Sequence, residues 1–178
     1  MRLSHEKESI NMGNNRIVCA LSGVFHFIYD WSGKQTWIGF FCPVNESTWE
    51  HLKLLFFPVL IFSAIEYIWI RKESKNFIAA RVTGTVLGMF TIIAVFYTYT
   101  GILGNHYLWL DLVTFFIGAL VTFLYTNYGM KRYREKTSTT IMAIVVFILF
   151  FAAFVIFTYP PHIGLFRDPI STKFGIID

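Results

Sequence analysis

Five long apolar stretches constrain this chain more than any other feature of its sequence. About 20 predominantly apolar residues make a helix long enough to cross the hydrocarbon core of a bilayer. Hydrophobic residues make up 55% of the 178 residues, more apolar surface than a soluble domain of this size can bury. Residues 1–178 are therefore predicted to form one all-α membrane domain, a bundle of five transmembrane helices. The predicted spans cover residues 17–32, 52–70, 77–103, 107–130 and 138–159.

A shorter apolar piece follows the first span. TWIGFFCPV, residues 36–44, is too short to cross the bilayer, so it is predicted to be an interfacial or re-entrant segment. It contains Cys42, and the other cysteine, Cys19, lies in the first span. Their spacing is not that of a metal-binding pair, and we interpret both as small hydrophobic residues.

The lysines and arginines predict how the bundle is oriented. Cytoplasmic loops carry an excess of these residues. The predicted cytoplasmic clusters are Arg2, Lys7 and Arg16; Arg71, Lys72, Lys75 and Arg81; and Lys131, Arg132, Arg134 and Lys136. Residues 101–110 contain no basic residue. The N-terminus is thus predicted to be cytoplasmic and the C-terminus outside, in a multi-pass cell-membrane protein. The net charge of +4 reflects this topology, so the expected partner is the lipid bilayer and not a nucleic acid.

This topology places most of the chemically versatile side chains at one membrane face. Four of the five histidines fall in or near the outer face, although they are far apart in sequence. The residues concerned are His26, His51, His106 and His162, with Asp30, Glu46, Glu50, Asp111 and Asp168. The polar cluster predicts a site that opens to the outside.

The string NESTWEHLK, residues 45–53, combines helix-start signals with residues that those signals do not explain. Ser47 and Glu50 fit a capping box, in which each side chain bonds the backbone N–H of the other residue. Trp49 suits the membrane interface, and Lys53 is long enough to extend to the surface. Capping explains neither Glu46 nor His51, which remain candidates for a site.

Two His–Asp pairs stand on other spans. His26 and Asp30 are four residues apart and share a helix face. They either brace the bundle through a hydrogen bond or form a metal site, in which Asp30 orients the His26 ring. His106 and Asp111 lie at the start of the fourth span.

Three further features predict packing. Glu66 and Arg81 lie at similar depths on neighbouring spans, which favours an ion pair over a proton relay. The Gly84–Gly88 spacing allows close helix approach, within the bundle or in a homodimer. Pro58 should kink the second span or free a carbonyl.

The tail around His162 and Asp168 contains too many helix breakers to be helical. It is either exposed or folded over the outer face.

Three strings, FHFIYDWSG (25–33), PVNESTWEHLKLLFFP (43–58) and LFRDP…FGI (165–176), resemble a bacterial family of small integral membrane proteins. The resemblance covers nearly the whole chain, and N-E-S-x-W-E-H-x-K is its most distinctive element. That family is catalogued only as a domain of unknown function, so the resemblance implies no activity. It does imply a bacterial inner-membrane setting.

The leading functional hypothesis is a metal-dependent membrane hydrolase. Histidine and carboxylate ligands suit Zn²⁺. The proposed ligands are His51 and His106 with His26 or Asp111, and Glu50 or Glu46 would be the general base that activates metal-bound water. The first alternative is a transport or small-ligand-binding protein that uses Glu66 as a coupling carboxylate. The second is a non-catalytic accessory subunit of a membrane complex.

Overall fold

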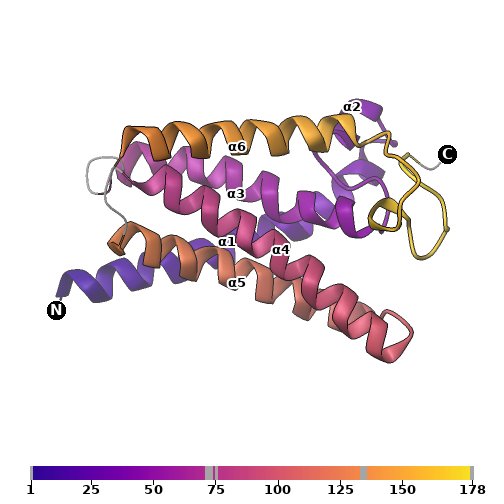
Figure 1. Cartoon of the computed structure of the whole chain (residues 1–178), viewed down its shortest axis with the longest axis horizontal. Helices are drawn as coiled ribbons and strands as arrows, with labels where there is room; N and C mark the ends of the chain where they lie inside the picture. The colour runs from indigo at the N-terminus through magenta and orange to yellow at the C-terminus, as the bar shows by residue number, and fades with distance from the viewer. Residues whose placement is uncertain (1, 71–73, 75, 133–135, 177–178) are drawn as a thin grey trace.

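The computed structural model describes residues 2–70, 74, 76–132 and 136–176. Within these ranges the chain is all-α (Figure 1). Its elements are α1 (Arg2–Trp31), α2 (Thr36–Gly39), α3 (Thr48–Ile70), α4 (Phe77–Leu103), α5 (Leu108–Arg132), α6 (Thr137–Ile156) and the short 3₁₀ helix η1 (Gly164–Phe166). The basic residues Arg71, Lys72, Lys75 and Arg134 lie outside the described residues.

The helices follow the predicted spans closely, and the differences occur at their ends. α4 begins and ends as predicted, whereas α3 begins four residues early, directly after Ser47. α6 ends at Ile156, because the Pro160–Pro161 pair a few residues later cannot continue a helix. α1 extends back to Arg2, since the polar segment before the first span contains no proline.

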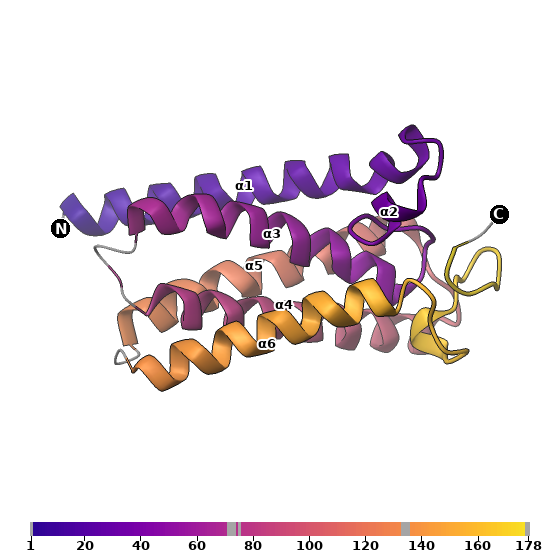
Figure 2. The ribbon, with the colours of Figure 1, turned by 90° about the horizontal axis from the view of Figure 1, so that it is seen from above.

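Four helices, α3 to α6, are long and apolar enough to cross a membrane, and α1 contributes a shorter apolar segment, Ile17–Trp31. The most apolar window of α6 has a mean hydropathy of 2.9, yet only 11% of it is buried. For α3 the buried share is 50%. α3 is thus the central helix, and the exposed apolar face of α6 is suited to lipid. Figure 2 shows α1 and α6 on opposite sides of the bundle.

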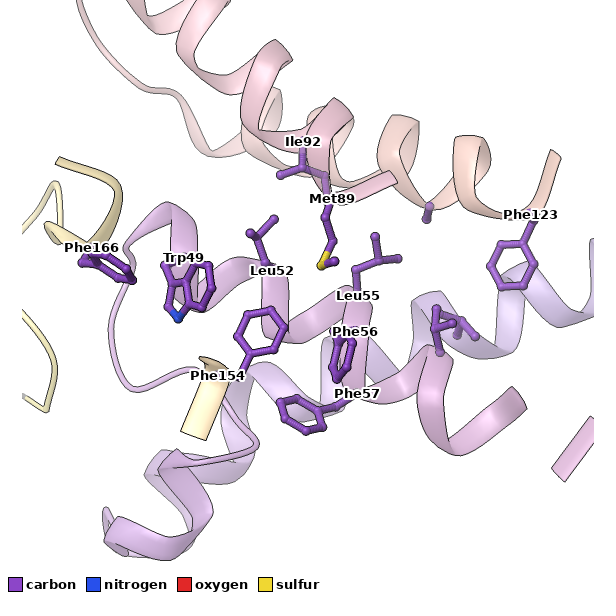
Figure 3. Close-up of a cluster of buried hydrophobic side chains, with 13 residues drawn as sticks. Trp49, Leu52, Leu55, Phe56, Phe57, Met89, Ile92, Phe123, Phe154 and Phe166 are labelled. Carbon is purple, nitrogen blue, oxygen red and sulfur yellow. The ribbon is translucent and has the colours of Figure 1, made fainter. Parts of the chain in front are cut away.

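Aromatic side chains join α3 to α6 and to the tail (Figure 3). Phe56 of α3 lies 5.0 Å from Phe154 of α6 between ring centroids, and Trp49 lies 4.7 Å from the same ring. Phe166 in η1 contacts Trp49 at 5.1 Å. Aromatic pairs at these separations add to the energy of burial, so the first turns of α3 anchor both α6 and the tail.

α4 and α5 make the most extensive helix contact, and glycines permit it. A Cβ atom on Gly84 would lie 2.5 Å from the Thr122 carbonyl oxygen, and one on Gly88 would lie 2.6 Å from the Gly118 carbonyl oxygen. Only a residue without a side chain allows backbones this close. Of the two predicted roles of the Gly84/Gly88 face, packing within the bundle is the one found, because α5 of the same chain covers this face.

Pro58 frees a backbone acceptor, as predicted. Proline has no N–H, so the carbonyl of Leu54, four residues earlier, loses its helical partner. The Ser22 hydroxyl of α1 lies 2.6 Å from that oxygen and 2.7 Å from the Val18 oxygen of its own helix. α1 therefore supplies the bond that α3 lacks, and this contact holds the two helices side by side (Figure 2).

α1, α4 and α6 finish at the end of the bundle where α3 and α5 begin. We call this the pocket end. α2 and the C-terminal tail lie there, and the N-terminus lies at the opposite end (Figures 1 and 2).

Candidate functional site

The segment before α3 is held by side chains that bond to backbone. The Glu50 N–H donates to the Ser47 hydroxyl at 3.3 Å, which is half of the predicted capping box. The other half differs: the Ser47 N–H donates to Asn45 Oδ1 at 2.8 Å, and Glu50 accepts from the Val44 N–H at 3.0 Å. The Asn45 amide also donates to the Gly175 oxygen at 2.7 Å, so the same turn holds the tail.

Glu50 and Lys53 form a buried ion pair. The Lys53 ammonium lies 2.7 Å from Glu50 Oε2, and the two side chains are 0% and 2% exposed. The ammonium also donates to the Gly39 oxygen at 2.8 Å and contacts the Thr158 hydroxyl at 3.4 Å. The predicted extension of Lys53 to the surface is therefore wrong. Glu50 is committed to this pair, in a position unsuited to a general base.

Glu46 lies between two histidines on different elements. Its carboxylate oxygens are 3.7 Å from His26 Nε2 and 3.3 Å from His51 Nε2. The two imidazole ring centroids are 5.8 Å apart. Glu46 therefore joins the pocket end of α1 to the beginning of α3.

The His51 ring also contacts the backbone. His51 Nδ1 lies 3.1 Å from the Ser47 carbonyl oxygen, and since a carbonyl can only accept, Nδ1 carries the proton. The other ring nitrogen, Nε2, is then the one that faces Glu46, at 3.3 Å from its nearer carboxylate oxygen.

Asp30 does not orient His26, contrary to the sequence-based hypothesis. Its side chain is exposed, and the carboxylate beside His26 is that of Glu46. Helix periodicity placed His26 and Asp30 on one face, but the turn between α2 and α3 brings Glu46 back to the histidine. The carboxylate nearest to His26 is thus the one that the loop brings back to it, and not the one four residues away in sequence.

His106 and Asp111 form a second histidine–carboxylate pair, at the start of α5. His106 Nδ1 lies 3.4 Å from Asp111 Oδ2. The Tyr99 hydroxyl of α4 donates to the other oxygen, Oδ1. Sequence reasoning missed Tyr99. A signal for it existed, because Tyr99 and Asp111 stand at similar distances from the α4–α5 turn and so face each other across it.

One pocket of about 250 Å³ separates the two pairs. Glu46 and His51 lie on the α3 side, and His106 and Asp111 lie on the α5 side. The remaining lining residues are Thr48, Ile92, Phe96, Leu108, Thr114, Phe115, Pro169 and Ile170. The pocket is thus mostly apolar, with its ionisable groups supplied by α3, by α5 and by the segments just before them, and with one wall supplied by the tail.

The predicted metal ligands divide between the two sides. His26 adjoins His51, and His106 adjoins Asp111. Across the described ranges, no three histidine, cysteine, aspartate or glutamate side chains are placed to hold a metal ion. As described, the arrangement is two histidine–carboxylate pairs facing one pocket.

Neither the cysteines nor the polar tail residues extend this site. Burial raises the pKa of the Cys42 thiol to about 11, against the opposing charge of Lys53. The group is therefore a poor nucleophile. His162 is exposed and stacks on Phe174 at 4.5 Å. Asp168 accepts bonds from the Ile170 N–H and the Ser171 hydroxyl, so it shapes the turn that presents Ile170 to the pocket.

The predicted Glu66–Arg81 ion pair is present between α3 and α4, far along α3 from Glu50. Arg81 Nη2 lies 2.5 Å from Glu66 Oε2. The guanidinium also lies over the Phe77 and Phe123 rings, 5.0 and 4.9 Å from their centroids. Glu66 and Arg81 are thus held in structural contacts, which weakens the case for Glu66 as the coupling carboxylate of a transporter.

Comparison with known proteins gives a family and no activity. Residues 2–176 match a family described as a family of unknown function (DUF6512). Neither a curated protein nor a solved structure matches the chain. The match covers nearly the whole length, in agreement with the resemblance carried by the N-E-S-x-W-E-H-x-K string. The chain therefore belongs to DUF6512, a family of unknown function.

Proposed function

We propose that this protein is a five-span membrane protein that binds a small amphiphilic molecule in the pocket between α3, α4 and α5. α1 would be the fifth span, with its polar N-terminal part on the cytoplasmic side of the cell membrane. The loop charges support this orientation. In it, the pocket opens near the outer face of the bilayer.

The observation that carries the proposal is the composition of the pocket wall. Ile92, Phe96 and Phe115 offer an apolar surface, and paired polar groups stand on two sides. Ligand sites typically combine such a surface with a few convergent polar groups. The volume, about 250 Å³, lies just below the range of roughly 300–1,000 Å³ for drug-sized ligands, which favours a small, single-chain molecule.

The polar pairs would position the head group of the ligand. Glu46 and Asp111 can accept hydrogen bonds, and the imidazole rings of His51 and His106 line the same pocket. The apolar chain would lie along Phe96 and Phe115. The tail residue Ile170 would cover it, held in place by the Asp168 turn.

Saturable photolabelling in nanodiscs tests this proposal. An eight-carbon alcohol with a diazirine at the chain end is expected to label the peptides around Phe96 and Phe115, and excess 1-octanol should abolish that labelling. Replacing Ile170 with tryptophan adds volume to the pocket wall and should reduce labelling several-fold. The matched control is Ile163→Trp, an exposed tail position that does not line the pocket. Labelling that is unsaturable, or unchanged in Ile170→Trp, would contradict the proposal.

A metal-dependent hydrolase is the second candidate, and it would require His26, His51 and Glu46 to move closer together, since no three such side chains among the described residues are placed to hold a metal ion. Two imidazole Nε2 atoms face one carboxylate, at 3.7 and 3.3 Å. Two histidines and a glutamate are a ligand set of zinc hydrolases. The His51 Nδ1–Ser47 contact would orient its ring for binding through Nε2.

Elemental analysis decides this second candidate. If it holds, purified protein contains about one zinc per chain, and His51→Ala lowers the zinc content by tenfold or more. His162→Ala, at the exposed histidine stacked on Phe174, should retain the metal and serves as the control. Protein that is free of transition metal after purification without chelators would exclude the candidate.

A further inference from the structure

The ionisable groups around the pocket are unbalanced in charge. Two carboxylates line it, Glu46 and Asp111, and its lining within the described part of the chain includes no lysine or arginine. Lys53 in the first turns of α3 is fully buried in its ion pair with Glu50 and is not among the residues that line the pocket. The local balance therefore rests on the carboxylates and their histidine neighbours.

Two neutral groups can donate to one of these carboxylates without changing its charge. The His106 ring can donate through Nδ1 to Asp111 while it remains uncharged. The Tyr99 hydroxyl donates to the other oxygen of the same carboxylate. The third nearby carboxylate, Asp168, bonds within its own turn. Among the described lining residues, two carboxylates without a lysine or arginine partner thus stand beside an apolar wall.

We propose that the ligand is a single-chain amphiphile with a cationic head group, of which a primary alkylamine is the simplest member. This inference rests on the proposed function and adds the charge of the ligand to it. Asp111 and Glu46 would accept charge-assisted hydrogen bonds from the ammonium. The rings of Phe96 and Phe115, which line the same pocket, would contact the chain or the cation. An anionic head group would be repelled by the same carboxylates.

Three photoreactive probes that share one eight-carbon chain test the proposal. They carry an amine, an alcohol or a carboxylate as head group and are compared in uncharged nanodiscs at pH 8. There alkylamines are protonated, and histidine as a residue type is mostly neutral. The amine is expected to compete for the pocket at about one-tenth the concentration needed for the alcohol, because charged hydrogen bonds are stronger. The carboxylate should be the weakest competitor.

Variants connect this preference to the two carboxylates. Asp111→Asn and Glu46→Gln should each bring the amine-to-alcohol ratio towards one. The control is Asp30→Asn, which removes an exposed carboxylate at the same end of the bundle and should keep the ratio. Each ratio is taken within one variant, so a partial loss of folded protein affects both probes equally.

The possible outcomes distinguish the proposed charge of the ligand from the proposed binding function. Saturable labelling by alcohol and amine with equal affinity overturns the cationic ligand and leaves the binding proposal standing. Preference for the carboxylate probe also overturns it. If none of the three probes labels the pocket saturably, the proposed binding function itself is wrong.

Discussion

Lys53→Met is expected to lower the free energy of unfolding by about 3–5 kcal/mol, because it leaves the buried Glu50 carboxylate without its charged partner. The Lys53 ammonium contacts three acceptors, Glu50, Gly39 and Thr158, so its loss affects α2, α3 and the end of α6 together. Equilibrium unfolding of detergent-solubilised protein by titrated denaturant measures the change.

Two further variants make this result specific to the buried pair. Lys173→Met removes an exposed lysine from the tail and should change stability by less than about 0.5 kcal/mol. The double variant Glu50→Leu, Lys53→Met removes both buried charges and should recover part of the loss, since an apolar pair needs no desolvation of charge. A Lys53→Met protein as stable as the parent would show that the pair is dispensable.

Gly88→Ala is expected to lower stability by about 1–3 kcal/mol through overpacking. Its added methyl group would stand 2.6 Å from the Gly118 carbonyl oxygen, and the Thr122 side chain also lies in the way. Backbone cannot rotate aside as a side chain can, so α4 and α5 must move apart along their whole contact. The loss should appear as a lower thermal unfolding midpoint in detergent.

Gly101 provides the matched control for this second variant. It lies in the same helix, yet a Cβ atom there would have no neighbour within 4 Å. Gly101→Ala should therefore be neutral or slightly stabilising, because alanine favours the helix more than glycine does. Equal effects at the two positions would show that helix propensity, and not close α4–α5 packing, controls the outcome.

Hydropathy predicted the helices well, because a long apolar run marks a whole helix and fixes how far along the helix each residue lies. α4 matches its predicted span residue for residue, and the Glu66–Arg81 pair followed from equal depth on neighbouring helices. The same reasoning placed His51 and His106 at one end of the bundle, where they line a common pocket.

The errors concern direction around a helix axis, which depth does not define. Lys53 was expected to reach the surface, but its side chain points into the bundle, where Glu50 and the Gly39 carbonyl bind it. Asp30 was paired with His26 by helical spacing, although Glu46 occupies that place. Such pairings depend on the course of the loops, here the turn between α2 and α3, and a periodic pattern contains no information about it.

The contacts of Lys53 and Asn45 have a consequence for the order in which the molecule is made. Thr158 follows Lys53 by 105 residues, and Gly175 follows Asn45 by 130. At a synthesis rate of roughly 5–20 residues per second, the lysine waits about 5–20 s for its last partner. During that interval α3 can already be in the membrane, while the Lys53 ammonium still lacks the Thr158 hydroxyl that will accept one of its hydrogen bonds. A segment that is synthesised more than 100 residues later thus completes bonds to side chains at the start of α3, and α3 reaches its final set of contacts only after that segment has been made.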